Sequence, residues 1–285
     1  MEKPVIIVSG KNGQLGKELK DAAVLFPQFY FHFFDRTELD IANAESINNT
    51  FEKYKPTYFI NTAAYTLVDK AETEQEQAYL INAAATGDIA NACKAYNTKL
   101  IHISTDYVFN GNGNEPYKET DATDPVNYYG YTKWMGEQLA LQNNPATIVI
   151  RTSWVYSVYG NNFVKTMLRL MKDRTDLNVV SDQFGTPTYA KDLAEVIMQI
   201  ISKGIFQPGI YHFSNEGEIN WYEFASAIKD KKQFNCTVHP IPSSQYPTPA
   251  KRPAYSVMSK EKIKSTFNIQ LKPWQQSLAA CLEKL

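Results

Sequence analysis

The chain has 285 residues, of which 44% are hydrophobic, and its formal net charge is −1. This length and composition allow a substantial buried core, in one large domain or two smaller ones. The near-zero charge, without a long run of one sign, argues against nucleic-acid or polybasic membrane contacts, so we expect small-molecule partners.

Short apolar runs alternate with helix-like stretches in the first half of the chain, which is typical of βαβ units and a parallel sheet. We predict strands at 5–9, 29–34, 57–63, 100–104 and 147–151, and helices near 14–25, 43–53, 76–96 and 129–142. Beyond residue 152 the pattern changes. The prolines of 240–253 predict a loop, between helical segments around 221–231 and 259–285. The fold class is therefore α/β.

Three glycines directly follow the first predicted strand and open the first helix, with the spacing G-x-x-G-x-x-G. They are Gly10, Gly13 and Gly16. Glycines at such a turn let the chain reverse, let backbone N–H groups approach a pyrophosphate, and allow the helix to pack closely on the strand. The placement favours a dinucleotide site, although three glycines at a strand end can also form only a turn.

The second and third predicted strands end in residues suited to the rest of a dinucleotide. Asp35 ends the second strand and would accept hydrogen bonds from an adenosine ribose, which favours NAD. Arg36 would instead pair with a 2′-phosphate, which favours NADP, so the residues leave the cofactor open. Ala63 and Ala64 allow close approach of a ligand to the backbone, although small residues also serve ordinary packing.

The segment NYYGYTK, at 127–133, contains three tyrosines and one lysine. Residues four apart share one face of a helix, so only Tyr129 lies on the same face as Lys133. A nearby ammonium lowers the pKa of a phenol, and we expect this pair to exchange a proton with a carbonyl or alcohol. Tyrosines packed at the start of an amphipathic helix are the alternative interpretation.

Hydroxyl side chains end the fourth predicted strand. Ser104 and Thr105 lie where ligands bind in a parallel α/β sheet, outside the carboxyl ends of the strands. Neighbours in an extended chain point to opposite sides, so we expect only one of them to face the site.

Other candidate sites are excluded by the scatter of their residues. The three cysteines are far apart, which predicts neither a disulfide framework nor a metal site. The four histidines are also scattered, and we expect packed or surface positions for them. The N-terminus lacks the features of a signal peptide, and no apolar stretch is long enough to span a membrane, so we expect a cytoplasmic protein.

The chain resembles the extended short-chain dehydrogenase/reductase superfamily and, within it, the dTDP-4-dehydrorhamnose reductase family. The resemblance rests on successive blocks between residue 10 and about residue 253, namely GKNGQLGKEL, AAYTLVDKAE, STDYVFNG, YGYTKWMGE, RTSWVY, GNNFVKTMLRL, DQFGTPT and YPTPAKRP. It implies a Rossmann-type doubly wound parallel sheet with a smaller C-terminal α/β domain. The dinucleotide-binding domain would comprise 1–152 and about 187–215, and the substrate domain 153–186 and 216–285.

The resemblance also implies the reaction, which is reduction of the 4-keto group of dTDP-4-dehydro-L-rhamnose to dTDP-L-rhamnose with NADPH, or sometimes NADH. By matching motifs, Tyr129 would protonate the C4 oxygen, Lys133 would hold the nicotinamide ribose, and Thr105, chosen over Ser104, would bind the reacting oxygen. The remaining cofactor contacts would come from the glycine motif and three later segments, namely Gly10, Gly13, Gln14, Leu15, Gly16, Asp35, Arg36, Asp40, Ile41, Ala63, Ala64, Tyr65 and Thr66.

Five residues would contact the sugar nucleotide besides Thr105. They are Val68, Asp69, Asp106, Trp154 and Arg252. The indole of Trp154 offers a flat apolar face and one N–H donor, and the fork of Arg252 suits phosphate oxygens. A core tryptophan and an exposed loop arginine are the alternatives.

Some members of this family hold magnesium at a subunit contact, with a glutamate shortly after the DQ-G-PT block. This chain has Lys191 and Asp192 near that place. Because a lysine cannot replace a carboxylate ligand, we predict no tight metal. We leave the oligomeric state open, with a homodimer as one candidate.

Two other functions remain for a chain of this superfamily. One is a nucleotide-sugar epimerase or dehydratase, although the dehydratases have Asp-Glu where this chain has Thr105-Asp106. The other is a non-catalytic NADP-binding regulatory subunit, against which the retention of Tyr129, Lys133 and Thr105 together argues.

Overall fold

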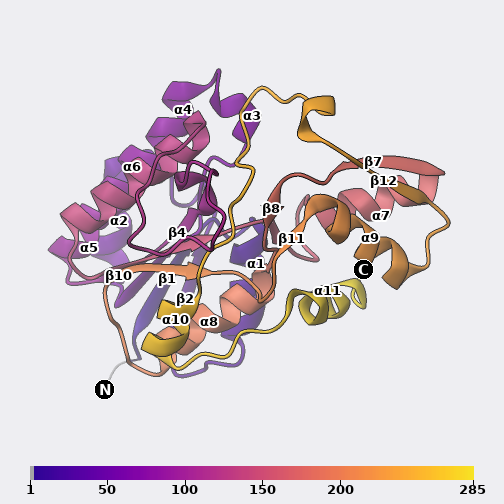
Figure 1. The fold of residues 1–285 in the computed structure, drawn as a ribbon. Coiled ribbons are helices and arrows are strands. Elements are labelled where there is room, and N and C mark those ends of the chain that lie inside the picture. The colour runs from indigo at the N-terminus through magenta and orange to yellow at the C-terminus, as the bar shows by residue number, and fades with distance from the viewer. Residues whose placement is uncertain (1–2) are drawn as a thin grey trace.

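The computed structural model describes residues 3–285. Six parallel strands form one sheet in the order β10-β5-β4-β3-β1-β2 (Figure 1). The strands are β1 (Val5–Ser9), β2 (Tyr30–Phe34), β3 (Tyr58–Asn61), β4 (Lys99–Thr105), β5 (Thr147–Thr152) and β10 (Gly209–Phe213). The predicted α/β class with a Rossmann-type parallel sheet is therefore confirmed. The strand order reverses between β1 and β3, which is where ligands bind in such sheets.

Helices cover both faces of the sheet, which explains why its strands are apolar almost throughout. Helices α1 (Gln14–Ala23) and α8 (Ala190–Ser202) pack on one face with Ile6 and Val8 of β1. On the other face, α2 (Ala44–Tyr54), α5 (Ala85–Ala95) and α6 (Tyr128–Asn143) pack with Ile7. Successive residues of β1 thus enter different cores because side chains alternate along a strand.

The helix predicted at 76–96 consists of three segments. They are α4 (Gln75–Tyr79), a π-helical turn η1 (Leu80–Ala84), and α5. A short helix α3 (Val68–Ala71) precedes them, and a 3₁₀ turn η2 (Asp106–Val108) follows β4.

A smaller part of the molecule lies beside the carboxyl ends of the sheet strands (Figure 1). Its core is formed by helices α7 (Phe163–Asp173), α9 (Trp221–Lys232) and α11 (Trp274–Leu282), which bury Val164, Phe224, Trp274 and Leu278. Its other elements are β6 (Val155–Tyr156), β7 (Asp176–Val180), β8 (Phe184–Gly185), β9 (Thr188–Tyr189), β11 (Ile219–Asn220), β12 (Thr237–Ile241) and the 3₁₀ turn η3 (Ser243–Gln245). Helix α10 (Glu261–Phe267) packs instead with β10 in the core beside the sheet.

Several elements differ from the sequence-based prediction, which gave none between residues 153 and 220. Pro240 and Ile241, expected in a loop, belong to β12, which pairs in parallel with β7 alone; an edge strand tolerates a proline because it needs fewer N–H donors. The helical segment at 259–285 is split, because Asn268 adopts a left-handed conformation and Pro273 precedes α11. Strand β10 was not predicted. Its sequence GIYHF is short and carries a histidine.

Within residues 3–285, no helix is long and apolar enough to cross a membrane. The three cysteines are buried free thiols.

Candidate active site

A cavity of about 800 Å³ lies at the carboxyl ends of the central strands, where the smaller part of the molecule meets the sheet. Three of its lining residues mark the strand ends: Gly10 directly follows β1, Thr62 follows β3, and Thr105 is the last residue of β4. Trp154 and Trp221 line it from the opposite side. The cavity thus lies at the point where the strand order reverses, as expected for a ligand site in a parallel sheet.

The glycine turn is packed too tightly for side chains at two of its three glycines. Gly10 has a φ of +79°, and a Cβ there would lie 2.8 Å from the Ala63 backbone nitrogen. Gly13 lines the cavity. Gly16 is not among the lining residues; a Cβ on it would lie 2.3 Å from the Gly10 oxygen, so it allows α1 to pack against the turn. The turn therefore tolerates side chains at neither Gly10 nor Gly16.

The N-terminus of α1 differs from those of four other helices. Asparagine side chains cap α2, α6, α7 and α9. The N-cap of α1 is Gly13, which provides no side-chain hydrogen bond, and the first turn carries no acidic residue. The first N–H groups of α1 are therefore available to an anion in the cavity, and the helix dipole favours a negative charge there.

Charged side chains surround the end of β2. The carboxylate of Asp35 accepts hydrogen bonds from the backbone N–H and hydroxyl of Thr37 and lies 3.1 Å from Lys11 Nζ. Together these contacts, the Thr37 hydroxyl first, lower the pKa of Asp35 to about 2. Lys11 also pairs with Glu38 at 2.5 Å. Arg36 is exposed at the cavity edge, so a cationic group remains available beside an occupied carboxylate.

Most of the other residues predicted at the cofactor end line the cavity. They are Gln14, Leu15, Asp40, Ile41, Ala63, Ala64 and Thr66. Tyr65 does not line it, because its side chain turns toward α3 and α4 and its hydroxyl donates to Glu74 at 2.6 Å. Strand β3 ends at Asn61, two residues earlier than predicted, so residues 62–66 lie in the loop that follows the strand.

Tyr129 lies at the start of α6, where Asn127 caps the helix by accepting a hydrogen bond from the Gly130 N–H. Burial raises the pKa of Tyr129 to about 12, and a hydrogen bond with Thr105 opposes the rise. We expected the lysine to lower this pKa below that of a free phenol, whereas burial raises it. The phenol is consequently protonated at neutral pH and can act as a proton donor.

Lys133 follows Tyr129 by one helical turn and also lines the cavity, with 2% of its surface exposed. Its Nζ donates to the Ile103 carbonyl oxygen at 2.6 Å and lies 3.4 Å from His102 Nε2. Burial lowers the pKa of Lys133 to about 8, against the opposing effect of Glu137. The lysine thus titrates close to neutrality.

Thr105 and Asp106 meet at the end of β4. The Thr105 hydroxyl donates to Asp106 Oδ1 at 3.0 Å and accepts from the Tyr107 N–H. Burial raises the pKa of Asp106 to about 6. Ser104 also borders the cavity, but its hydroxyl oxygen is buried and makes no hydrogen bond with another described residue. Which of the two hydroxyls faces the ligand stays a prediction.

Trp154 adopts a left-handed backbone conformation, with φ of 48°, and its ring stacks on that of Trp221 with the centroids 3.5 Å apart. Gly185 leaves room for this pair, since a Cβ there would lie 2.6 Å from the Trp154 ring. Sequence reasoning missed Trp221. Its position at the start of α9, directly after the Asn220 capping box, gives no local signal of a site.

Two of the residues predicted to contact the substrate bind each other. Arg252 forms a two-point ion pair with Asp69, at 2.5 and 2.9 Å, and neither residue lines the cavity. Asp69 also accepts a hydrogen bond from the Ala250 N–H. Val68, on the same short helix, does line the cavity. The pair therefore fastens the 250–252 segment to α3.

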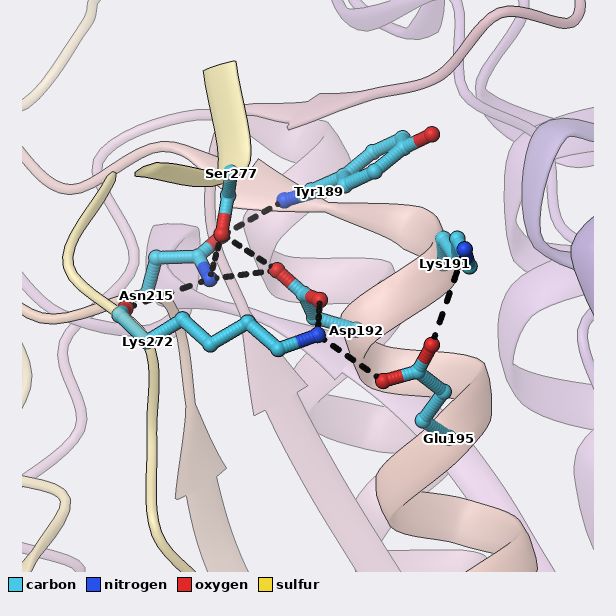
Figure 2. A network of polar contacts seen from close by, with 7 residues as sticks. All are labelled: Tyr189, Lys191, Asp192, Glu195, Asn215, Lys272 and Ser277. Carbon is cyan, nitrogen blue, oxygen red and sulfur yellow. Dashed lines mark hydrogen bonds and ion pairs between the residues drawn. The ribbon is translucent and has the colours of Figure 1, made fainter. Parts of the chain in front are cut away.

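Figure 2 shows Lys191 and Asp192, near the place where the resemblance puts the magnesium-binding glutamate of some family members. Asp192 is buried there and accepts hydrogen bonds from Ser277 and Asn215, while Lys272 pairs with it at 2.7 Å. Lys191 pairs with Glu195 at 3.9 Å. The carboxylate thus ties α8 to the C-terminal segment, and no metal-ligating cluster of His, Cys, Asp and Glu occurs in the described part of the chain.

Comparison with known proteins places these features in a family. The family model described as "RmlD substrate binding domain" matches residues 4–285. The dTDP-4-dehydrorhamnose reductase of Aggregatibacter actinomycetemcomitans is 42% identical over 96% of each chain. The spore coat polysaccharide biosynthesis protein SpsK of Bacillus subtilis is 39% identical over 98% of this chain and 97% of its own. The crystal structure of dTDP-4-dehydrorhamnose reductase from Bacillus anthracis in complex with NADP superposes with a TM-score of 0.95, at 38% identity over 99% of this chain and all of that one.

Proposed function

We infer the reaction from one premise, namely that this chain belongs to the RmlD substrate binding domain family. The chain is a dTDP-4-dehydrorhamnose reductase, which reduces the 4-keto group of dTDP-4-dehydro-L-rhamnose to dTDP-L-rhamnose with NADPH. The observation that carries the inference is that Thr105, Tyr129 and Lys133 border the same cavity as the uncapped N-terminus of α1.

NADPH suits the cavity for reasons that lie in the residues present. The open glycine turn and the free N–H groups of α1 would hold its pyrophosphate, and Arg36 with Lys11 would pair with its 2′-phosphate. Asp35, which Lys11 and Thr37 already satisfy, repels that phosphate less than an unpaired carboxylate would. When bound, NADPH supplies the hydride for the 4-keto carbon.

Tyr129 supplies the proton that the reduction consumes. Because its pKa lies near 12, the phenol carries its proton at neutral pH and delivers it to the oxygen as negative charge develops there. The Lys133 ammonium stabilises the resulting phenolate. Thr105 donates to the same oxygen when its hydroxyl turns away from Asp106.

The substrate side of the cavity is formed by Val68, Asp106 and the paired rings of Trp154 and Trp221. The indole faces offer an apolar surface to a 6-deoxysugar, and Asp106 offers carboxylate oxygens to its hydroxyl groups. We propose that the ion pair of Asp69 and Arg252 lies beside this subsite. Arg252 contacts the sugar diphosphate only after it separates from Asp69.

This assignment divides the chain into a cofactor-binding domain and a substrate-binding domain. Residues 1–152 and about 187–215 form the dinucleotide-binding domain, and 153–186 with 216–285 form the substrate domain. The pairing of β10 with β5 supports the inclusion of 187–215 in the first domain. We place the enzyme in the cytoplasm, where reduced thiols such as Cys93 persist, and a homodimer stays a prediction.

The test measures the loss of NADPH absorbance when purified protein is mixed with NADPH and dTDP-4-dehydro-L-rhamnose. We expect one NADPH consumed per sugar, and a fall of about 10²- to 10⁴-fold in kcat for Tyr129→Phe. Tyr131→Phe is the matched control, since Tyr131 is exposed on another face of α6. An active Tyr129→Phe enzyme would refute the proton donor, and a wild type that leaves NADPH intact would refute the reaction.

A further inference from the structure

A row of buried polar side chains crosses the sheet beside the site. Ser9, Asn61 and His102 occupy paired positions on the neighbouring strands β1, β3 and β4. Paired positions place their side chains on the same face of a sheet, and none of the three is more than 1% exposed. Two residues earlier, the corresponding row is fully apolar. It consists of Ile7, Phe59 and Leu100.

The polar row ends at Lys133. Ser9 Oγ donates to Asn61 Oδ1 at 2.8 Å, and Asn61 Nδ2 lies 3.2 Å from His102 Nδ1. On the other side of the imidazole, His102 Nε2 lies 3.4 Å from Lys133 Nζ. A continuous chain of contacts therefore joins Lys133 to three residues that do not line the cavity.

The donors and acceptors of this row determine the tautomer of His102. Because Asn61 Oδ1 accepts from Ser9, its amide nitrogen donates to His102 Nδ1, which must then carry a lone pair. A neutral imidazole in that state has its proton on Nε2, facing Lys133 Nζ. An ammonium has no lone pair to receive it, so this arrangement fits Lys133 only as a neutral amine.

The opposite arrangement fits Lys133 as an ammonium. If the Asn61 amide turns over, its nitrogen donates to Ser9 Oγ and its oxygen accepts from a proton on His102 Nδ1. His102 Nε2 then presents a lone pair to the ammonium, and the Ser9 hydroxyl accepts from the amide instead of donating to it. The charge of Lys133, the tautomer of His102 and the orientation of Asn61 thus change together.

We propose that His102 is a positioning residue for Lys133, and that with Asn61 and Ser9 it forms a two-state hydrogen-bonded row that sets whether the lysine is an ammonium or an amine. The role of the row in catalysis rests on the proposed function, because Lys133 acts there on the Tyr129 phenolate. The existence of the two states does not depend on it.

The electrostatic surroundings agree with such a row. Burial, and then the Lys133 charge, hold the pKa of His102 well below its usual value, so the ring stays neutral and changes only its tautomer. Glu137, on the same helix as Lys133, favours the ammonium, although it is itself paired with Arg151 of β5 at 2.7 Å. Tyr129 and Asp106 border the same cavity.

The first test observes the row without substrate. The chain has four histidines, and ¹⁵N-histidine-labelled protein gives separate ring-nitrogen signals, with His102→Phe identifying those of His102. Between pH 6 and 9 we expect the proton of His102 to move from Nδ1 to Nε2 while the ring stays neutral. In Lys133→Met no such exchange should occur. A single tautomer throughout in the wild type would overturn the proposal.

The second test follows kcat against pH. Activity requires the ammonium, so kcat falls as pH rises through the Lys133 pKa. His102→Phe removes the lone pair that the buried ammonium needs, and we expect this alkaline limb to move down by about one pH unit. Asn61→Asp offers only acceptors to His102, which fixes the lone pair toward Lys133, and the limb should move up by about as much.

A purely structural role for His102 would lower kcat without moving the limb, and that result would contradict the proposal. The two variants are expected to shift the pKa of Lys133 in opposite directions, which a general loss of folding would not do. If the wild type fails to oxidise NADPH with the sugar nucleotide, the proposed function fails, and the ¹⁵N measurement still decides whether the two-state row exists.

Discussion

The rings of Trp154 and Trp221 lie almost parallel, at 12°, with their centroids 3.5 Å apart, although the residues are far apart in the chain. Both rings border the cavity, one from the segment after β5 and the other from the start of α9. The stacked pair forms part of the cavity wall, on the side where we propose that the sugar binds. Trp154 has a left-handed backbone conformation there.

We expect Trp221→Ala to raise the KM for the nucleotide sugar about 10-fold, because Trp154 loses the ring that fixes it. The KM for NADPH should change little, and Trp221→Phe should recover most of the loss. Tyr222→Ala, at the next position of α9 and outside the cavity, is the control. Equal changes in both KM values would show that the pair only stabilises the fold.

Thr105→Val removes a hydroxyl while keeping the shape of the side chain. We expect kcat to fall about 100-fold, since the reacting oxygen loses a hydrogen-bond donor, and Thr105→Ser should restore most of it. Ser104→Ala tests the neighbouring residue, which also borders the cavity. Steady-state kinetics at saturating NADPH decide the matter; a larger effect at Ser104 than at Thr105 would reverse the assignment.

Arg36→Ala should weaken the binding of NADPH far more than that of NADH. The side chain is exposed at the cavity edge, and a guanidinium pairs strongly with a 2′-phosphate. We expect the KM for NADPH to rise about 10-fold or more, with NADH nearly unaffected. Arg174→Ala, at an exposed arginine just after α7, serves as the control. Parallel losses for both cofactors would place Arg36 outside the phosphate site.

The lowered pKa of Lys133 predicts a pH-dependent difference in stability. The pKa is about 8 in the fold and 10.5 in a free lysine, so burying the ammonium costs free energy at every pH below 8. That cost disappears as pH rises from 8 to 10.5. Relative to Lys133→Met, the wild type should therefore gain stability over this range, by about 3 kcal/mol at most. Paired denaturant titrations at pH 7 and pH 10 measure the gain, and a constant difference would contradict it.

Asp192 holds the C-terminal segment against α8 through Ser277 and Lys272, and it also accepts a hydrogen bond from Asn215 (Figure 2). Asp192→Asn should lower the free energy of unfolding by about 2 kcal/mol, because it removes the charge that pairs with Lys272 within a buried network. Glu195→Gln is the matched control. Its side chain is 37% exposed and should contribute under about 1 kcal/mol. Equal losses in the two variants would refute the importance of the buried contact.

Local patterns in the sequence were sufficient for the main elements of the fold. The apolar run of β1 forms a strand of the sheet, and Gly10 and Gly13, which follow it, line the cavity. The pair Tyr129 and Lys133 also follows from helical spacing alone. In each case the interacting residues lie within a few positions of one another, so periodicity and turn chemistry specify their relation.

The tertiary structure decided every relation between distant segments. The stacking of Trp221 on Trp154, the pairing of Arg252 with Asp69, and the contact of His102 with Lys133 join residues whose neighbours in sequence give no sign of their partners. The pKa of Tyr129 belongs to the same class, because its rise comes from burial that the surrounding elements provide. Sequence thus determined the chemistry available to the site, while packing determined which groups meet and how strongly each holds its proton.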